Sequence, residues 1–278
     1  MPNKNKNNTT TELHYFSFSS DVLIKSCPLP KEMIHSINTK THTLTIEAVK
    51  TLSLSEYLKK TKKHMEYHDT EKMIQMIGKQ LQYMETMDKG IPSFNLDDIS
   101  VFYSRVAVTS HKHRKAASTD DTDDTDDTDN TDDTDDTDDT DDTDTIINFA
   151  LTNDDKVCDF EDAEQQQLKI TTPYKPEYTA SSHKNNNQAF ISPEFKEFIS
   201  KKTIPYSIHF KSGYYSFGLL CAHCFVSKTA VAPATNAAVA PATNAAAAAL
   251  APIKNTKIYW FLMRVLHENP SVRRYICV

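Results

Sequence analysis

Glycine is scarce in this sequence: the 278 residues contain only four glycines, and none precedes Gly78. This absence excludes a glycine-rich phosphate-binding loop from the N-terminal part, because such loops need glycine where backbone amides approach a phosphate. No apolar run reaches the ~20 residues that span a bilayer, and MPNKNKNNTT at the N-terminus lacks the apolar segment of a secretory signal. The five cysteines form no regular disulfide framework, which is typical of a reducing compartment. We therefore expect an intracellular, cytoplasmic protein that does not bind a membrane.

Two low-complexity segments interrupt the chain. Residues 116–145 contain a near-perfect Thr-Asp-Asp repeat, and residues 227–252 contain AVAPATNA twice. Neither segment offers the apolar face that would offset the entropy of ordering it, so we expect two surface inserts without a fixed fold. The net charge of −7 includes the sixteen aspartates of the first repeat, so the rest of the chain is mildly basic. The remaining residues, roughly 225, are enough for one well-buried domain.

Apolar periodicity predicts strands, then helices, then a small cluster of strands, and finally helices again. Strands are expected over 13–29, 41–50, 98–108, 145–151, 156–160 and 168–172. Helices are expected over 54–60, 71–87, 193–202, 214–226 and 255–269. Ser53 or Ser55 can cap the first helix, Gly90 is expected to end the second, and Pro270 the last. Trp260, the only tryptophan, is predicted to lie in the core with its apolar neighbours.

This order of elements, with a series of short motifs, resembles the protein kinase fold from about Thr41 to the C-terminus. THTLTIEAVKTLSLSEYLKK is similar to the last strand of a kinase small lobe, its hinge and the following helix. MIQMIGKQLQYMETMDKGI is similar to the long helix that leads to the catalytic loop, and GIPSFNLDDISVF to that loop entering its strand. CDFED lies where a metal-binding Asp-Phe-Gly is expected. FISPEF resembles the Ala-Pro-Glu end of the activation segment, SGYYSFGLL the buried helix of the large lobe, and LHENPSVRR the Leu-x-x-Asp-Pro-x-x-Arg near its end.

The resemblance implies an α+β, protein kinase-like fold with a helical large lobe and a truncated β small lobe. Residues 1–52 would form a reduced small-lobe-like β segment and hinge. Residues 53–278 would form a large-lobe-like helical domain that carries both inserts. In the kinase fold the Glu of the Ala-Pro-Glu motif pairs, buried, with the late Arg, which implies a structural ion pair between Glu194 and Arg273.

The resemblance also implies that the catalytic parts of a kinase are missing. Ser93 falls at the position of the catalytic base, and a hydroxyl does not accept a proton near neutral pH as a carboxylate does. Asp98 falls at the position of a metal-binding Asn, and Asp159 would match the other metal ligand, so both are candidate metal ligands. Gly213 replaces the helix-start Asp that normally braces the catalytic loop. Too few residues precede the hinge-like strand for a complete small lobe.

Three other clusters suggest binding chemistry, but each has a simpler interpretation. Cys221 and Cys224 would need further ligands to hold zinc, and no second pair lies at finger spacing, so we expect both thiols to pack as small hydrophobes. The basic stretch HKHRK, at 111–115, lies beside the acidic repeat and makes a poor nucleic-acid surface. The repeat itself lacks the glycine turn and spaced ligands of an EF-hand.

Three functional hypotheses follow. The preferred one is a kinase-like protein that lacks key catalytic motifs, needs no cofactor and acts as a non-catalytic scaffold by binding another protein. The second is a divergent active serine/threonine kinase, which would bind ATP and Mg²⁺ through Asp98 and Asp159 and transfer phosphate to protein. The third is an unrelated α+β interaction protein whose kinase-like motifs are coincidental. A protein partner is expected in the first case, and nucleic acid is not.

Overall fold

The computed structural model describes residues 13–61, 64–105, 145–162, 164, 166–171, 190–201, 203–225 and 250–275. In these ranges the chain is α+β, as predicted, with six α-helices and several small antiparallel sheets. Within the same ranges, no helix is both long and apolar enough to cross a membrane. Most of both predicted inserts, and the HKHRK stretch, lie outside the described residues.

The N-terminal sheet contains three antiparallel strands in the order β1-β3-β2. They are β1 (His14–Phe18), β2 (Ile34–Asn38) and β3 (Thr43–Ala48). Alternate residues of β3 are buried, as expected for a strand with one face on the core. The prediction of strands throughout 13–29 is wrong after Phe18, because Ser20 caps a short helix, α1 (Asp21–Lys25), by accepting from Leu23 N. The 3-10 turn η1 (Lys31–Met33) then leads into β2.

A second sheet has the order β4-β7-β8 and is built on a long hairpin. Its strands are β4 (Lys50–Ser53), β7 (Ile99–Arg105) and β8 (Thr145–Leu151). Ile99 pairs with Leu151 at one end of the hairpin and Arg105 with Thr145 at the other. Arg105 and Thr145 therefore lie side by side, and Thr145 belongs to β8 rather than to the insert.

Helices α2 (Leu54–Lys60) and α3 (Tyr67–Glu85) follow β4 in the chain. Ser53 is the cap of α2: its Oγ accepts from Glu56 N at 3.3 Å while the Glu56 carboxylate accepts from Ser53 N at 2.9 Å. The expected stop of α3 at Gly90 is wrong. Asp88 makes the turn with φ of 53°, a conformation that Asp tolerates better than most residues, and no described glycine has positive φ.

The rest of the described chain forms short strands and three more helices. The strands are β5 (Lys89–Gly90), β6 (Ser93–Phe94), β9 (Cys158–Asp162), β10 (Gln167–Ile170), β11 (Phe190–Ile191) and β12 (Tyr206–His209). The helices are α4 (Pro193–Lys201), α5 (Ser212–Phe225) and α7 (Lys257–Val265). Three 3-10 turns complete the set: η2 (Leu96–Asp98), η3 (Ala251–Ile253) and η4 (Pro270–Val272). One sheet has the order β12-β10-β9-β5, and β11 pairs with β6.

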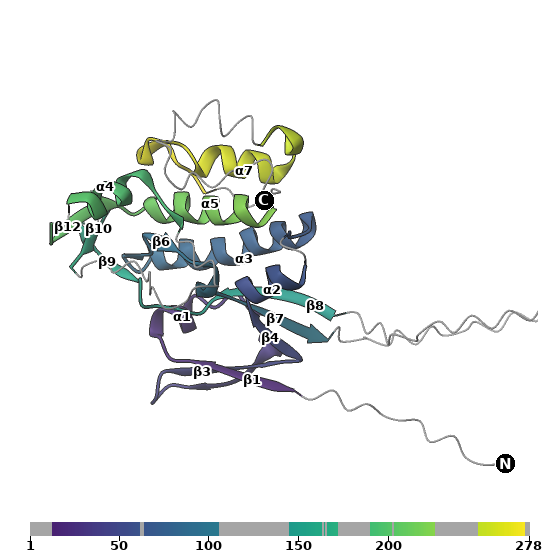
Figure 1. Ribbon diagram of the computed structural model, residues 1–278. Helices are drawn as coiled ribbons and strands as arrows, with labels where there is room; N and C mark the ends of the chain where they lie inside the picture. The colour runs from purple at the N-terminus through teal and green to yellow at the C-terminus, as the bar shows by residue number, and fades with distance from the viewer. Residues whose placement is uncertain are drawn as a thin grey trace, which may run out of the picture.

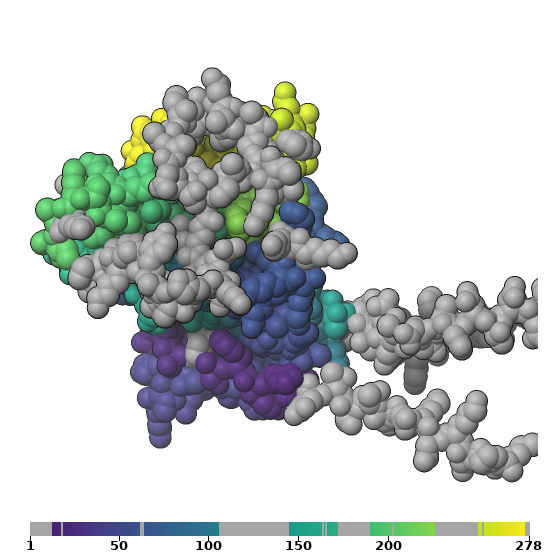
Figure 2. Space-filling view, in the orientation of Figure 1, coloured from purple at the N-terminus to yellow at the C-terminus, as the bar shows by residue number. Residues whose placement is uncertain are grey.

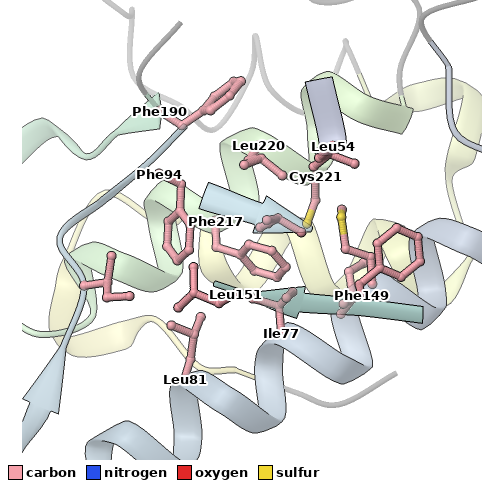
Figure 3. Packing of buried hydrophobic residues seen from close by; sticks show 14 of the residues in the cluster. Leu54, Ile77, Leu81, Phe94, Phe149, Leu151, Phe190, Phe217, Leu220 and Cys221 are labelled. Carbon is pink, nitrogen blue, oxygen red and sulfur yellow. The ribbon is translucent and has the colours of Figure 1, made fainter. Parts of the chain in front are cut away.

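Helices α3, α5 and α7 are stacked in layers above the β4-β7-β8 and β1-β3-β2 sheets (Figure 1). Helix α3 lies against β8 and α5, and α5 lies against α7. The N-terminal sheet therefore forms the end of the molecule opposite to α7, purple against yellow in Figure 2. One hydrophobic cluster runs through these layers; in its centre Phe217 of α5 lies close to Ile77 and Leu81 of α3 and to Leu151 of β8 (Figure 3).

The prediction that Trp260 lies in the core is wrong, because its side chain is 55% exposed. The buried residues of α7 are Ile258, Phe261, Leu262 and Val265, the i, i+3, i+4, i+7 stripe of a helix packed on one side. Trp260 falls outside that stripe. The second insert also ends earlier than expected, since Leu250 is buried and η3 follows it.

The exposed position of Trp260 gives a direct test of the fold. Because it is the only tryptophan, the native protein should show the red-shifted emission of a hydrated indole and strong quenching by acrylamide. Trp260→Phe should change the free energy of unfolding by no more than about 0.5 kcal/mol, as is usual for surface substitutions. Blue-shifted emission that is protected from acrylamide would show that the side chain is buried.

Candidate functional site

The segment from Ile91 to Asp98 is the candidate site. It is connected to β5 before it and to β7 after it, and it pairs with β11. Helix α3 is followed by β5 and then by this segment, whose last residues form the η2 turn before β7. In the middle of the segment β6 pairs with β11, so that Ser93 lies opposite Ile191. We refer to residues 91–98 as the central loop.

Helix α5 packs directly against the central loop. Gly213 lies so close to Ile91 that a Cβ at 213 would overlap the Ile91 carbonyl oxygen, so only glycine fits there. One turn later, Ser216 Oγ donates to the carbonyl oxygen of Pro92 at 2.8 Å. At the start of α5, Ser212 shares a hydrogen bond with the Ser192 hydroxyl. The helix that the kinase resemblance places beneath a catalytic loop therefore contacts the central loop through backbone and hydroxyl groups.

Asp98 is the buried carboxylate of the central loop, and its residue surface is 3% exposed. Its Oδ2 accepts from Asn95 N at 2.7 Å and from Lys156 Nζ at 2.6 Å, and its Oδ1 accepts from Asn153 Nδ2 at 3.0 Å. In the orientation that satisfies its neighbours, the Asn95 side-chain oxygen accepts a further hydrogen bond from Lys156 Nζ at 3.2 Å. Both carboxylate oxygens are thus occupied by groups of the same chain.

Asp159, the other candidate metal ligand, lies elsewhere. It is on β9, its side chain is 76% exposed, and it pairs with Lys89 of β5. The structure therefore does not bring Asp98 and Asp159 together around a common ligand. The residues that contact the Asp98 carboxylate from beyond β8 are Asn153 and Lys156. Because Ile99 and Leu151 are paired across the hairpin, the residues that directly follow Leu151 must lie beside Asp98.

Sequence reasoning missed Asn153 and Lys156 because it followed the letters Asp-Phe in CDFED. The usable signal was the distance from the end of the predicted strand at 151, after which Asn153 is the second residue. Further hydrogen bonds hold the residues after β8 against Asp98 and Ser100. Thr152 N donates to the Asp98 carbonyl at 3.0 Å, and the Ser100 and Thr152 hydroxyls are 2.8 Å apart.

Ser93, at the expected position of a catalytic base, is 1% exposed. Its Oγ is buried and has no hydrogen-bond partner among the described residues. A hydroxyl in this state has neither the basicity to accept a proton nor access to a substrate. The central loop therefore presents no general base at this position.

With the Lys156 ammonium in place, the residues around Asp98 do not fit a divalent metal ion. Mg²⁺ needs oxygen ligands in near-octahedral arrangement, usually including one or two carboxylates. The described side chains that hydrogen-bond to the Asp98 carboxylate, Asn153 and Lys156, bring no second carboxylate, and the Lys156 ammonium already contacts one of its oxygens. No step that depends on Mg²⁺ or on ATP follows from this arrangement.

Glu194 and Arg273 form an ion pair. Arg273 has no exposed side-chain surface and Glu194 has 19%. The guanidinium donates to both carboxylate oxygens, NH1 to Oε1 and NH2 to Oε2, the latter at 3.0 Å. It also donates to the carbonyl oxygens of His267 at 2.7 Å, Glu268 at 2.9 Å and Lys211 at 3.3 Å, and it lies 4.7 Å from the centre of the Tyr215 ring.

Cys221 and Cys224 lie within the core on α5 and are both 0% exposed. Burial in this apolar environment raises the pKa of both thiols, most strongly by desolvation of the thiolate. Among the described residues, no group of three or more His, Cys, Asp and Glu side chains is placed to hold a metal ion. The two thiols contact hydrophobic neighbours, as expected from the sequence.

No protein-family model, curated protein or solved structure matches this chain.

Removal of either partner of the Glu194–Arg273 pair should destabilise the protein strongly. Glu194→Ala and Arg273→Ala should each lower the free energy of unfolding by roughly 3–5 kcal/mol, because each leaves a buried charge uncompensated. The double variant should cost much less than the sum of the two single variants. Urea unfolding measured by circular dichroism checks both expectations.

Glu197→Ala is the matched control on the same helix. Glu197 pairs with Lys201 in an i,i+4 arrangement in which both side chains are more than half exposed, so its loss should cost no more than about 0.5 kcal/mol. Small and additive effects at Glu194 and Arg273 would show that this pair, too, contributes little.

The buried thiols should be unreactive in the native protein. At neutral pH, iodoacetamide should leave Cys221 and Cys224 unmodified in peptide mass spectra, because the pKa of each is raised and neither is accessible. Both should react fully in guanidinium chloride. Prior treatment with EDTA should change nothing, and protection that EDTA removes would indicate a bound metal instead.

Proposed function

We propose that this chain is a protein kinase-like protein without catalytic activity, and that it acts by binding another protein. The observation that carries the proposal is the state of the central loop. Ser93 is buried at the base position, and the carboxylate of Asp98 is held by Lys156 of the same chain. Such a loop offers neither a proton acceptor nor an available metal ligand for phosphoryl transfer.

The kinase-like part of the proposal is supported by contacts between segments that resemble kinase motifs in sequence. The long helix α3 leads through β5 into the central loop. Helix α5 touches that loop at Ile91 and Pro92. Glu194, from the Ser-Pro-Glu motif, pairs with Arg273, from the late Pro-x-x-Arg motif. Coincidental motifs give no reason for these three relationships, so they disfavour the hypothesis of an unrelated fold.

The hypothesis of an active kinase requires Asp98 and Asp159 to share a metal ion. Lys156 holds the first carboxylate, whereas the second lies on β9 with an exposed side chain that pairs with Lys89. Residues 1–77 contain no glycine, so this part of the chain supplies no glycine-rich loop to cover a phosphate. Both observations favour the non-catalytic alternative.

The proposed binding role is based on the buried ion pair between Glu194 and Arg273. A buried guanidinium and its carboxylate are costly to assemble, yet the pair is present in a chain whose Ser93 is buried and whose Asp98 is held by Lys156. A fold that is maintained without catalysis acts through its surface, and we infer that its ligand is a protein.

The purified protein should not bind Mg²⁺-ATP. Millimolar ATP with Mg²⁺ should leave the melting temperature unchanged, since only a ligand that binds the folded state raises it. Incubation with labelled ATP should incorporate no phosphate into the chain or into general kinase substrates. An active protein kinase under the same conditions provides the positive control.

A saturable rise in melting temperature, or phosphate incorporation that Asp98→Ala abolishes, would instead support the active-kinase hypothesis.

The binding role has its own test. A partner identified by crosslinking in cells and then purified should bind the isolated chain without nucleotide, and Asp98→Asn should leave the dissociation constant unchanged. Binding that requires ATP would contradict the proposal.

A further inference from the structure

Lys156 places its ammonium group between two oxygen atoms of the central loop. Its Nζ lies 2.6 Å from Asp98 Oδ2 and 3.2 Å from the Asn95 side-chain oxygen. The lysine side chain is 21% exposed and the Asp98 side chain is 5% exposed. This pair therefore differs from the surface pairs of the chain, such as Lys169 with Glu161, whose side chains are 44% and 38% exposed at 3.4 Å.

The surroundings of the ammonium are those of a cation site. A carboxylate oxygen and an amide oxygen are the ligands that hard cations prefer. The second Asp98 oxygen is fixed by Asn153 Nδ2, and Asn153 is itself fixed because its Oδ1 accepts from Asp155 N at 3.0 Å. The orientation of the carboxylate is thus set by the protein, and its Oδ2 is directed at the position that Lys156 Nζ occupies.

We infer that Lys156 Nζ is the resident cation of a site formed by Asp98 Oδ2 and the Asn95 side-chain oxygen, and that this tethered ammonium excludes divalent metal ions from it. A group attached to the chain competes at a high effective concentration. A dissolved Mg²⁺ must instead lose strongly held water to enter. The inference concerns this site alone and is independent of whether the chain binds a partner protein.

The role of Lys156 goes beyond that of an ordinary ion pair. In an ordinary ion pair, loss of the lysine would only leave the partner carboxylate without a counter-charge. A resident cation leaves a vacant site that another cation can fill. The two oxygens, completed by water, should then bind Mn²⁺ with an apparent Kd on the order of 1 mM, at the weak end of protein sites for divalent cations.

The test uses the full chain and titrates it with Mn²⁺, which is followed by melting temperature and by the electron paramagnetic resonance signal of free Mn²⁺. Lys156→Met keeps the aliphatic stem and removes the charge. It should bind Mn²⁺ saturably and gain melting temperature on binding, whereas the wild type should do neither. Adding Asp98→Asn to Lys156→Met should weaken the binding at least about tenfold. Lys169→Met, the surface control, should gain no Mn²⁺ binding.

A folded Lys156→Met protein that gains no Mn²⁺ binding would overturn the inference. Wild-type binding that Asp98→Asn abolishes would overturn it too, since the lysine would then not exclude the metal.

A second measurement on the wild type covers the case in which Lys156→Met does not fold. Acetic anhydride should modify Lys156 at least about tenfold more slowly than Lys169, a larger ratio than their exposures alone give, because a held ammonium must first leave its site. Mass spectrometry of peptides gives both rates. Asp98→Asn should remove most of the protection, and equal rates in the wild type would contradict the inference.

Discussion

The C-terminal half of this protein depends on a single buried guanidinium. Arg273 has no exposed surface, and besides the Glu194 carboxylate it donates to the carbonyl oxygens of Lys211, His267 and Glu268. An arginine cannot lose its charge in a protein, so every one of these acceptors must be in place when it is buried. The start of α4, the segment before α5 and the turn after α7 are therefore positioned together, and helix α5 is held where it contacts the central loop.

A second buried carboxylate is neutralised in a different way. Asp98 is paired with a lysine, a compact charge on a flexible stem, rather than with a planar arginine that grips two oxygens at once. The first arrangement suits a position that a small cation can occupy, and the second suits a permanent structural joint. The chain thus has a structural ion pair at Arg273 and, in the central loop, a carboxylate whose charge is satisfied by a lysine of the same chain.

Much of the fold could be predicted from the sequence because the periodic segments are long and the turns are well marked. The helices at 54–60, 214–226 and 255–269 and the strand at 145–151 were found to within a few residues, and the Ser53 cap follows from Ser-x-x-Glu. The start of α3 was placed too late. It begins at Tyr67 where the chain docks on α5, since Met65 N donates to the Cys224 carbonyl, and local pattern does not contain that contact.

The candidate site was less predictable, and the reason is geometrical. Ser93, Asp98, Glu194 and Arg273 could be selected from motifs, because residue type and order survive in the sequence. Asp159 was selected by the same means, but its side chain is exposed on β9 and pairs with Lys89. Which residue faces Asp98 depends on the register of β7 and β8, which brings residues more than fifty positions apart into contact.

The sequence by itself determined the α+β class, the order of the elements and the types of residue available for a site, because these depend on local periodicity and composition. Only the tertiary structure decided which charges meet. It paired Asp98 with Lys156 and with the Asn153 amide, and it buried Ser93 without a described partner. Such pairings depend on strand register and on the closeness of helix packing, as at Gly213 against Ile91, and a chain has neither property until distant segments are packed together.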